Sequence, residues 1–135
     1  MNIPKTDSES TPTSLVDFTP SRPQLASLTP SRRRDLFGGH GEVQVWSLLH
    51  PHALDPFRAA LWCELEPSGV VGRHLQQHYP EILICLAGTG TVNIGQQSHD
   101  FIPGVCLTLP RGEILHITCG DQAPLNYLII KAEHK

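Results

Sequence analysis

From residue 41 onward, the chain consists of short apolar or alternating runs separated at regular intervals by glycine, proline and polar pairs. Alternation with a period of two is typical of β-strands, whose successive side chains point to opposite faces. Turn signals about every eight to twelve residues predict an antiparallel sandwich or barrel. Nine strands are expected, over residues 42–49, 57–66, 70–76, 82–86, 91–94, 98–101, 105–109, 114–119 and 125–131.

Length and charge limit the class of protein. A chain of 135 residues suits one domain with a single core. The net charge of −3 offers no broad basic field, so we expect neither nucleic acid nor a membrane surface as a partner. The start of the chain lacks an apolar signal segment, and no apolar run is long enough to span a bilayer. We expect a cytoplasmic protein that binds small molecules or other proteins.

Residues 1–37 have a different composition, rich in serine, threonine and proline. Five prolines exclude a long helix or central strand there, which predicts an extended N-terminal arm before a barrel over residues 38–135. Apolar residues in the arm, such as Leu15 and Phe18, favour contact with the barrel or with a partner subunit over a disordered linker, which stays as the alternative.

The cysteines are spread singly, without CxxC spacing, and three of the four lie in apolar runs. This distribution predicts reduced core thiols in a cytosolic protein rather than disulfides or a zinc site. They are Cys63, Cys85, Cys106 and Cys119.

Side chains able to bind a metal or transfer a proton gather at residues 72–81. In an extended strand His74, Gln76 and His78 share one face. Because a strand rises about 3.3 Å per residue, His74 and His78 lie about 13 Å apart and cannot share an ion. Either His74 and Gln76 share the ion, or the chain bends near Gln77 and brings His78 back toward His74. A helix would also bring His74 and His78 together, but nearby glycines and Pro80 argue against one.

Glu81 opens the next predicted strand, in step with Leu83 and Cys85. This parity places its carboxylate on the inner face of the barrel. A buried charge needs a partner, and a metal ion with histidine neighbours would supply one.

Two motifs resemble those of the cupins, a family of small metal-binding jelly-roll barrels. The first family motif runs Gly, five residues, His, one residue, His, three or four residues, Glu, six residues, Gly. Here Gly69, His74, Glu81 and Gly88 occupy this frame, with four residues before His74 and with Gln76 in place of the second histidine.

The second cupin motif runs Gly, five residues, Pro, one residue, Gly, two residues, His. Gly104, Pro110, Gly112 and His116 follow it, except that three residues precede His116. Fifteen residues separate Gly88 from Gly104, at the compact end for the family.

The resemblance implies an all-β, antiparallel double-sheet jelly-roll barrel around one divalent transition metal ion, Fe, Mn, Ni or Zn. It implies His74, Glu81 and His116 as ligands, with Gln76 or His78 completing the set. Two imidazoles and one carboxylate form the facial triad of non-haem iron sites, although an amide oxygen is a weaker ligand than imidazole. The alternative is a metal-free polar pocket in which these groups bind one another and water.

Two functions from different classes follow from the resemblance. The first is a small-molecule enzyme of dioxygenase, sugar isomerase or epimerase, or lyase type, in which Glu81 or His78 moves a proton. The second is a non-catalytic module that binds or senses a small ligand without a required metal. An apolar outer face at Ile82, Ile84 and Leu86 also predicts a homodimer, and a purely structural dimerisation unit is a third, weaker reading.

Overall fold

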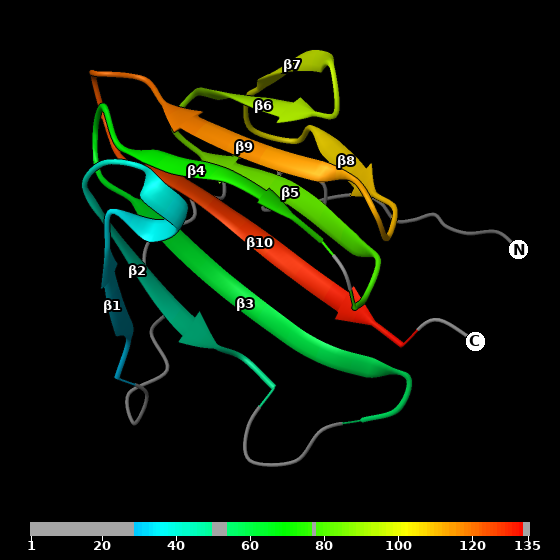
Figure 1. Ribbon diagram of the computed structural model, residues 1–135. Helices are drawn as coiled ribbons and strands as arrows, with labels where there is room; N and C mark the ends of the chain where they lie inside the picture. Colours follow the sequence, from blue (N-terminus) through cyan, green and yellow to red (C-terminus); the bar gives the residue numbers. More distant parts are fainter. Residues whose placement is uncertain (1–28, 50–53, 77, 134–135) are drawn as a thin grey trace, which may run out of the picture.

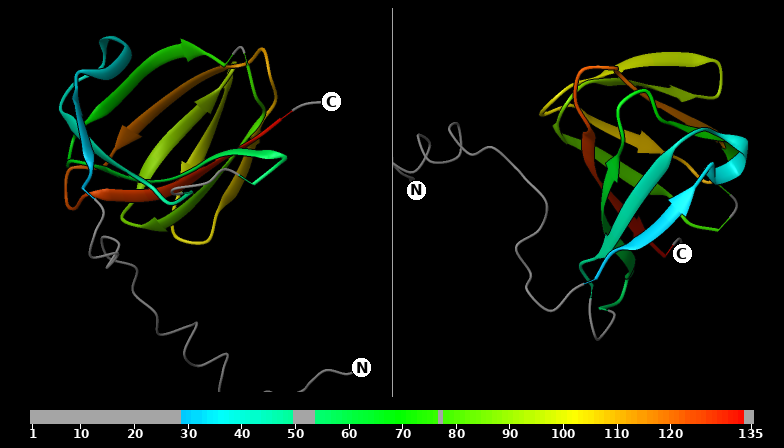
Figure 2. Two further views of the ribbon diagram at one scale, coloured as in Figure 1. Left: turned by 90° about the horizontal axis from the view of Figure 1, so that it is seen from below. Right: turned by 90° about the vertical axis from the view of Figure 1, so that its left-hand side faces the viewer.

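The computed structural model describes residues 29–49, 54–76 and 78–133, which form two facing antiparallel sheets (Figure 1). The larger sheet contains, in spatial order, β1 (Ser31–Arg34), β2 (Glu42–Ser47), β3 (Phe57–Leu65), β10 (Leu125–Ala132), β5 (Glu81–Ala87) and β8 (Cys106–Leu109). The smaller contains β4 (Val70–Leu75), β9 (Ile114–Cys119), β6 (Gly90–Ile94) and β7 (Gln97–Phe101). The expected all-β jelly-roll barrel is confirmed, and Figure 2 shows it from two further sides.

All nine expected strands are present, with ends that differ by no more than two residues from those expected. The structure adds β1, which pairs with β2 so that Ser31 lies opposite Val45. This strand falls within residues 1–37, so the last part of the expected arm belongs to a sheet of the barrel. Residues 1–28 of the arm lie outside the described part of the chain.

Between β1 and β2 the chain forms η1 (Leu36–Gly38), a single 3-10 turn. It packs against β4 at two glycines. A Cβ atom on Gly72 would lie 2.0 Å from the Phe37 carbonyl oxygen, and one on Gly39 would lie 1.9 Å from that of Val70. Both glycines therefore permit a backbone contact that any side chain would block. Within the described ranges, no helix is long and apolar enough to cross a membrane.

Alternation along β10 divides the interior of the barrel. Leu125, Tyr127, Ile129 and Lys131 are in step on its inner face. At the Leu125 end, fully buried side chains fill the space between the sheets, including Phe101, whose ring meets that of Tyr127 edge to face at 6.0 Å. From Tyr127 to Lys131, the inner side chains line a cavity instead.

The cysteines are all unpaired, and Cys63, Cys85 and Cys119 are buried, as expected, whereas Cys106 is exposed. Burial raises the pKa of the Cys63 thiol to about 12 and that of Cys85 to about 11. Both thiols are therefore protonated at neutral pH and act as small packing groups.

Candidate functional site

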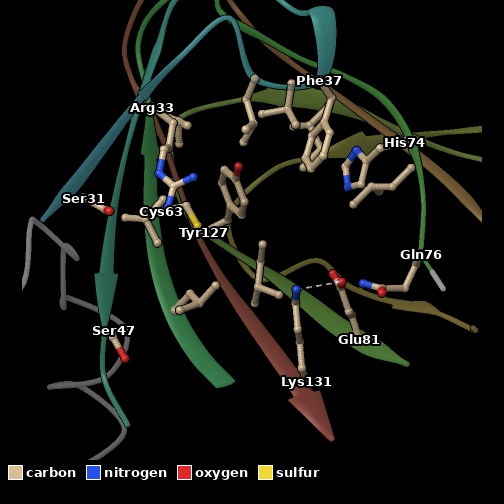
Figure 3. Close-up of a pocket in the computed structure, with 18 of the residues that line it drawn as sticks. Ser31, Arg33, Phe37, Ser47, Cys63, His74, Gln76, Glu81, Tyr127 and Lys131 are labelled. Carbon is tan, nitrogen blue, oxygen red and sulfur yellow. Dashed lines mark ion pairs between the residues drawn. The ribbon is translucent and has the colours of Figure 1, made fainter. Parts of the chain in front are cut away.

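A cavity of about 660 Å³ lies between the two sheets at the hollow end of the barrel (Figure 3). This volume is in the usual range for small-molecule sites. Most of the wall is apolar, formed by Val43, Val45, Leu61, Val71, Leu115, Ile117 and Ile129 together with Leu36 and Phe37 of η1. The polar and charged lining residues are Ser31, Arg33, Ser47, His74, Gln76, His78, Glu81, Tyr127 and Lys131.

An irregularity in β4 turns His74 into this cavity. Val71 lies opposite Ile117 of β9, and His74 lies opposite Leu115, so three steps along β4 face two along β9. The additional residue is a β-bulge, which reverses the alternation of the strand. Because of it, both Val71 and His74 face inward. Gly72 lies inside the bulge, where the backbone of η1 approaches.

The ring of His74 is held from two sides. Its Nδ1 atom lies 2.9 Å from the carbonyl oxygen of Gly72, and its face stacks on Phe37 with ring centroids 3.9 Å apart. A carbonyl can only accept a hydrogen bond, so Nδ1 carries the proton and Nε2 keeps a free lone pair. Burial lowers the pKa of His74; the Gly72 contact opposes this shift and the nearby Lys131 charge adds to it. His74 is therefore a neutral acceptor at pH 7.

Glu81 has a charged partner from the neighbouring strand. It is 4% exposed and lies opposite Lys131 of β10, with Nζ 3.6 Å from Oε2. Burial raises the pKa of Glu81, while the charge of Lys131 opposes the shift. The inward orientation expected for Glu81 is present, but the partner found for its carboxylate is an ammonium group.

Gln76 and His78 have different surroundings. Gln76 is 7% exposed and faces the cavity, and its side-chain oxygen accepts a hydrogen bond of 3.3 Å from the backbone N–H of His78. His78 is exposed at the rim of the cavity, with its ring 6.1 Å from that of Tyr79. Of these two candidate ligands, the structure buries the glutamine.

His116 lies on the other face of its sheet. The inward positions of β9 are Leu115, Ile117 and Cys119, all buried, and His116 lies opposite Asn93 of β6. The extra residue between Gly112 and His116 causes this, because a shift of one position in a strand moves a side chain to the opposite face. The expected meeting of His116 with His74 and Glu81 is therefore not what the structure shows; Leu115 occupies the inward position.

No family model and no curated protein matches the chain in sequence. Solved structures do match it in fold. One described as a predicted oxalate decarboxylase from Thermotoga maritima is 25% identical, over 81% of this chain and 96% of its own, with a TM-score of 0.75. A cupin-2 domain protein from Rhodospirillum rubrum is 14% identical, over 85% of this chain and 77% of its own, with a TM-score of 0.71. The chain has the cupin fold.

A third similar structure is a polyketide cyclase from Streptomyces resistomycificus, 17% identical over 83% of this chain and 78% of its own, with a TM-score of 0.66. At these identities, the similarity establishes the cupin fold only. The chemistry has to be inferred from the residues of the cavity.

The donor set of the cavity does not fit a divalent metal held by three strong ligands. Across residues 29–49, 54–76 and 78–133, no three His, Cys, Asp or Glu side chains are placed to hold one ion. The cavity offers the Nε2 atom of His74, the amide of Gln76 and the carboxylate of Glu81. A Lys131 ammonium group beside that carboxylate repels a cation, and Leu115 supplies no donor atom.

The sequence analysis did not predict that Arg33, Tyr127 and Lys131 line the cavity. Lys131 and Tyr127 alternate in step with Leu125, so the parity of the predicted strand over 125–131 could have placed them inside. Arg33 lies in the segment SRRR, whose four exposed residues carry no apolar pattern that would reveal a strand.

Proposed function

We propose that this cupin binds a small organic molecule in the barrel cavity and that binding needs no metal ion. The observation that carries the proposal is that the cross-strand neighbour of His74 is Leu115, an apolar residue, on one wall of a largely apolar cavity of about 660 Å³. A ligand bound there would bury its apolar body against residues such as Val45, Leu61 and Ile117. Its orientation would come from the few polar groups, which is the usual arrangement in small-molecule sites.

The first experiment asks whether an apolar probe enters the cavity of the metal-free protein. The full chain is treated with EDTA, and binding of phenylpropanol is followed by ligand-observed NMR. Leu61→Phe fills part of the cavity, whereas Ile84→Phe adds the same ring to the outer face of the same sheet. Binding should persist in EDTA, weaken in Leu61→Phe and remain in Ile84→Phe. Binding that disappears in EDTA and returns with Zn²⁺ would contradict the proposal.

A second candidate function is metal-independent proton transfer to or from the bound molecule. It is favoured by the two inward groups His74 and Glu81, because the pKa of His74 is lowered and the pKa of Glu81 is raised. The lowered pKa keeps His74 a neutral base with a free Nε2 lone pair, and the raised pKa makes the Glu81 carboxylate a stronger base than an exposed one. Exchange of the acidic protons of β-tetralone in deuterium oxide would test it. Wild-type exchange no faster than in buffer would exclude this candidate for such ketones.

The wider expectations from the sequence stay predictions. They include a metal-dependent enzyme of dioxygenase, isomerase, epimerase or lyase type, with His78 or Glu81 as the proton-transfer group. Metal analysis of protein purified without a histidine tag tests this reading directly. A cytoplasmic location is also part of the proposal, because all four cysteines are unpaired thiols, as in a reducing compartment.

A further inference from the structure

We infer that the ligand of this cavity is an amphiphilic organic carboxylate whose charged group binds Arg33. The inference rests on the proposed function, since it names the chemical class of molecule that the cavity takes. It assigns a role in recognition to β1, the strand that precedes the expected barrel.

Arg33 reaches the cavity because of its register. It lies opposite Val43 of β2, whose side chain lines the cavity, so both residues are on the inner face of the sheet. Its neighbour Arg32 is out of step by one position and bonds Glu42 at 3.3 Å. In Figure 3 the guanidinium group of Arg33 points from β1 into the cavity, on the side of Tyr127 and across from His74.

The charges of the lining leave Arg33 as the cation available to a ligand. The lining residues include two cations, Arg33 and Lys131, and one carboxylate, Glu81. Glu81 lies 3.6 Å from Lys131, whereas no described carboxylate lies within ion-pair distance of Arg33. The described lining residues therefore carry an excess positive charge in a chain whose net charge is −3. Such a local field concentrates anions at the cavity.

The chemistry of the two walls defines the rest of the ligand. A guanidinium group stays protonated and presents paired N–H donors that match the two oxygens of a carboxylate. The wall beside it is apolar, formed by Val43, Val45 and Leu61. A single cation next to an apolar wall suits a molecule with one carboxylate and a hydrocarbon body, such as an aryl-alkyl carboxylic acid.

A matched pair of probes tests the assignment. Phenylpropionate and phenylpropanol have the same aromatic body and differ in the carboxylate. Their affinities for the full chain in EDTA are measured by NMR titration, for the wild type and for Arg33→Gln, Arg33→Lys and Arg32→Gln. The last variant removes the same charge from the opposite face of the same strand. Circular dichroism and melting temperature confirm that each variant is folded.

The wild type should bind phenylpropionate more tightly than phenylpropanol. Arg33→Gln should weaken the binding of phenylpropionate about tenfold, the effect of losing one charge-assisted hydrogen-bonding group. Its affinity for phenylpropanol should be unchanged. The affinity of Arg33→Lys for phenylpropionate should lie between those of the wild type and Arg33→Gln. Arg32→Gln should bind both probes as the wild type does. Equal affinity for both probes, unaffected by Arg33→Gln, would overturn the carboxylate assignment and leave the proposed cavity function standing. Failure of both probes to bind would overturn both.

Discussion

His74 and Leu115 lie directly opposite each other where β4 pairs with β9. Their positions put an imidazole and an isobutyl group on the same wall of the cavity, at the place where the resemblance implied two metal ligands. The bulge at Gly72 keeps His74 on the inner face, and the extra residue after Gly112 keeps His116 on the outer face.

Replacing Leu115 with histidine should create metal affinity. The Leu115→His variant adds an imidazole opposite His74 in the cavity that Glu81 also lines, giving the cavity three strong donors. Without metal, the variant should lose about 1–3 kcal/mol of unfolding free energy, because a polar group replaces a buried apolar one. Co²⁺ absorption spectra measure the gain, and His116→Ala serves as the control that changes nothing. A wild type that binds Co²⁺ as tightly as the variant would contradict our description of the donor set.

His74 should make the protein less stable in mild acid. Its pKa is lowered in the folded state, so its neutral form is favoured there, and its contribution to stability is lost as the pH falls below about 6.5. In urea unfolding, the His74→Gln variant should accordingly lose less unfolding free energy than the wild type between pH 7 and 5, a window set by the ordinary histidine pKa. Parallel curves for the two proteins would show that burial does not affect this imidazole.

Glu81 should have the opposite pH dependence. Its pKa is raised in the folded state, so its contribution is present below about 4.5 and is lost as the pH rises through the raised value. The stability of Glu81→Gln relative to the wild type should therefore increase with pH above that point. Unfolding curves at several pH values measure the difference, and a constant offset would mean that Lys131 fully compensates for burial.

Gly72→Ala should destabilise the protein strongly. The added methyl group would meet the Phe37 backbone oxygen at 2.0 Å, and backbone atoms on both sides leave no cheap relaxation. We expect a loss of about 3 kcal/mol or more in unfolding free energy. Gly104→Ala is the control, because its φ of +93° is strained but its surroundings are open, which predicts about 1–2 kcal/mol. Equal losses in both variants would indicate that η1 can move away from β4.

The expected homodimer can be tested on the outer face of the larger sheet. Ile82 is 39% exposed and borders an apolar groove with Phe57 and Ile130. Sedimentation of the wild type should show a dimer, and Ile82→Glu should shift it to monomer, because a charge opposes burial of the groove. Ile102→Glu changes an exposed residue outside that groove and should leave the dimer intact. A monomeric wild type would rule out the homodimer.

The nine expected strands could be predicted because their inner residues are apolar at every second position, as in Leu115, Ile117 and Cys119. The same parity already implied that His116 faces outward, a signal that the motif spacing concealed. The bulge in β4 could not be predicted, since it depends on how η1 contacts Gly72. The contact of Lys131 with Glu81 depends on the pairing of β10 with β5, which strand prediction alone does not fix.

Along β10, alternate inner residues pass from the packed end at Leu125 to the hollow end at Lys131. One strand thus connects two regions with separate demands, since close packing governs the first and chemical selectivity governs the second. Redesign of what the molecule recognises can therefore begin at Lys131 and its cross-strand neighbours, while the Leu125 half retains the contacts that keep the barrel folded.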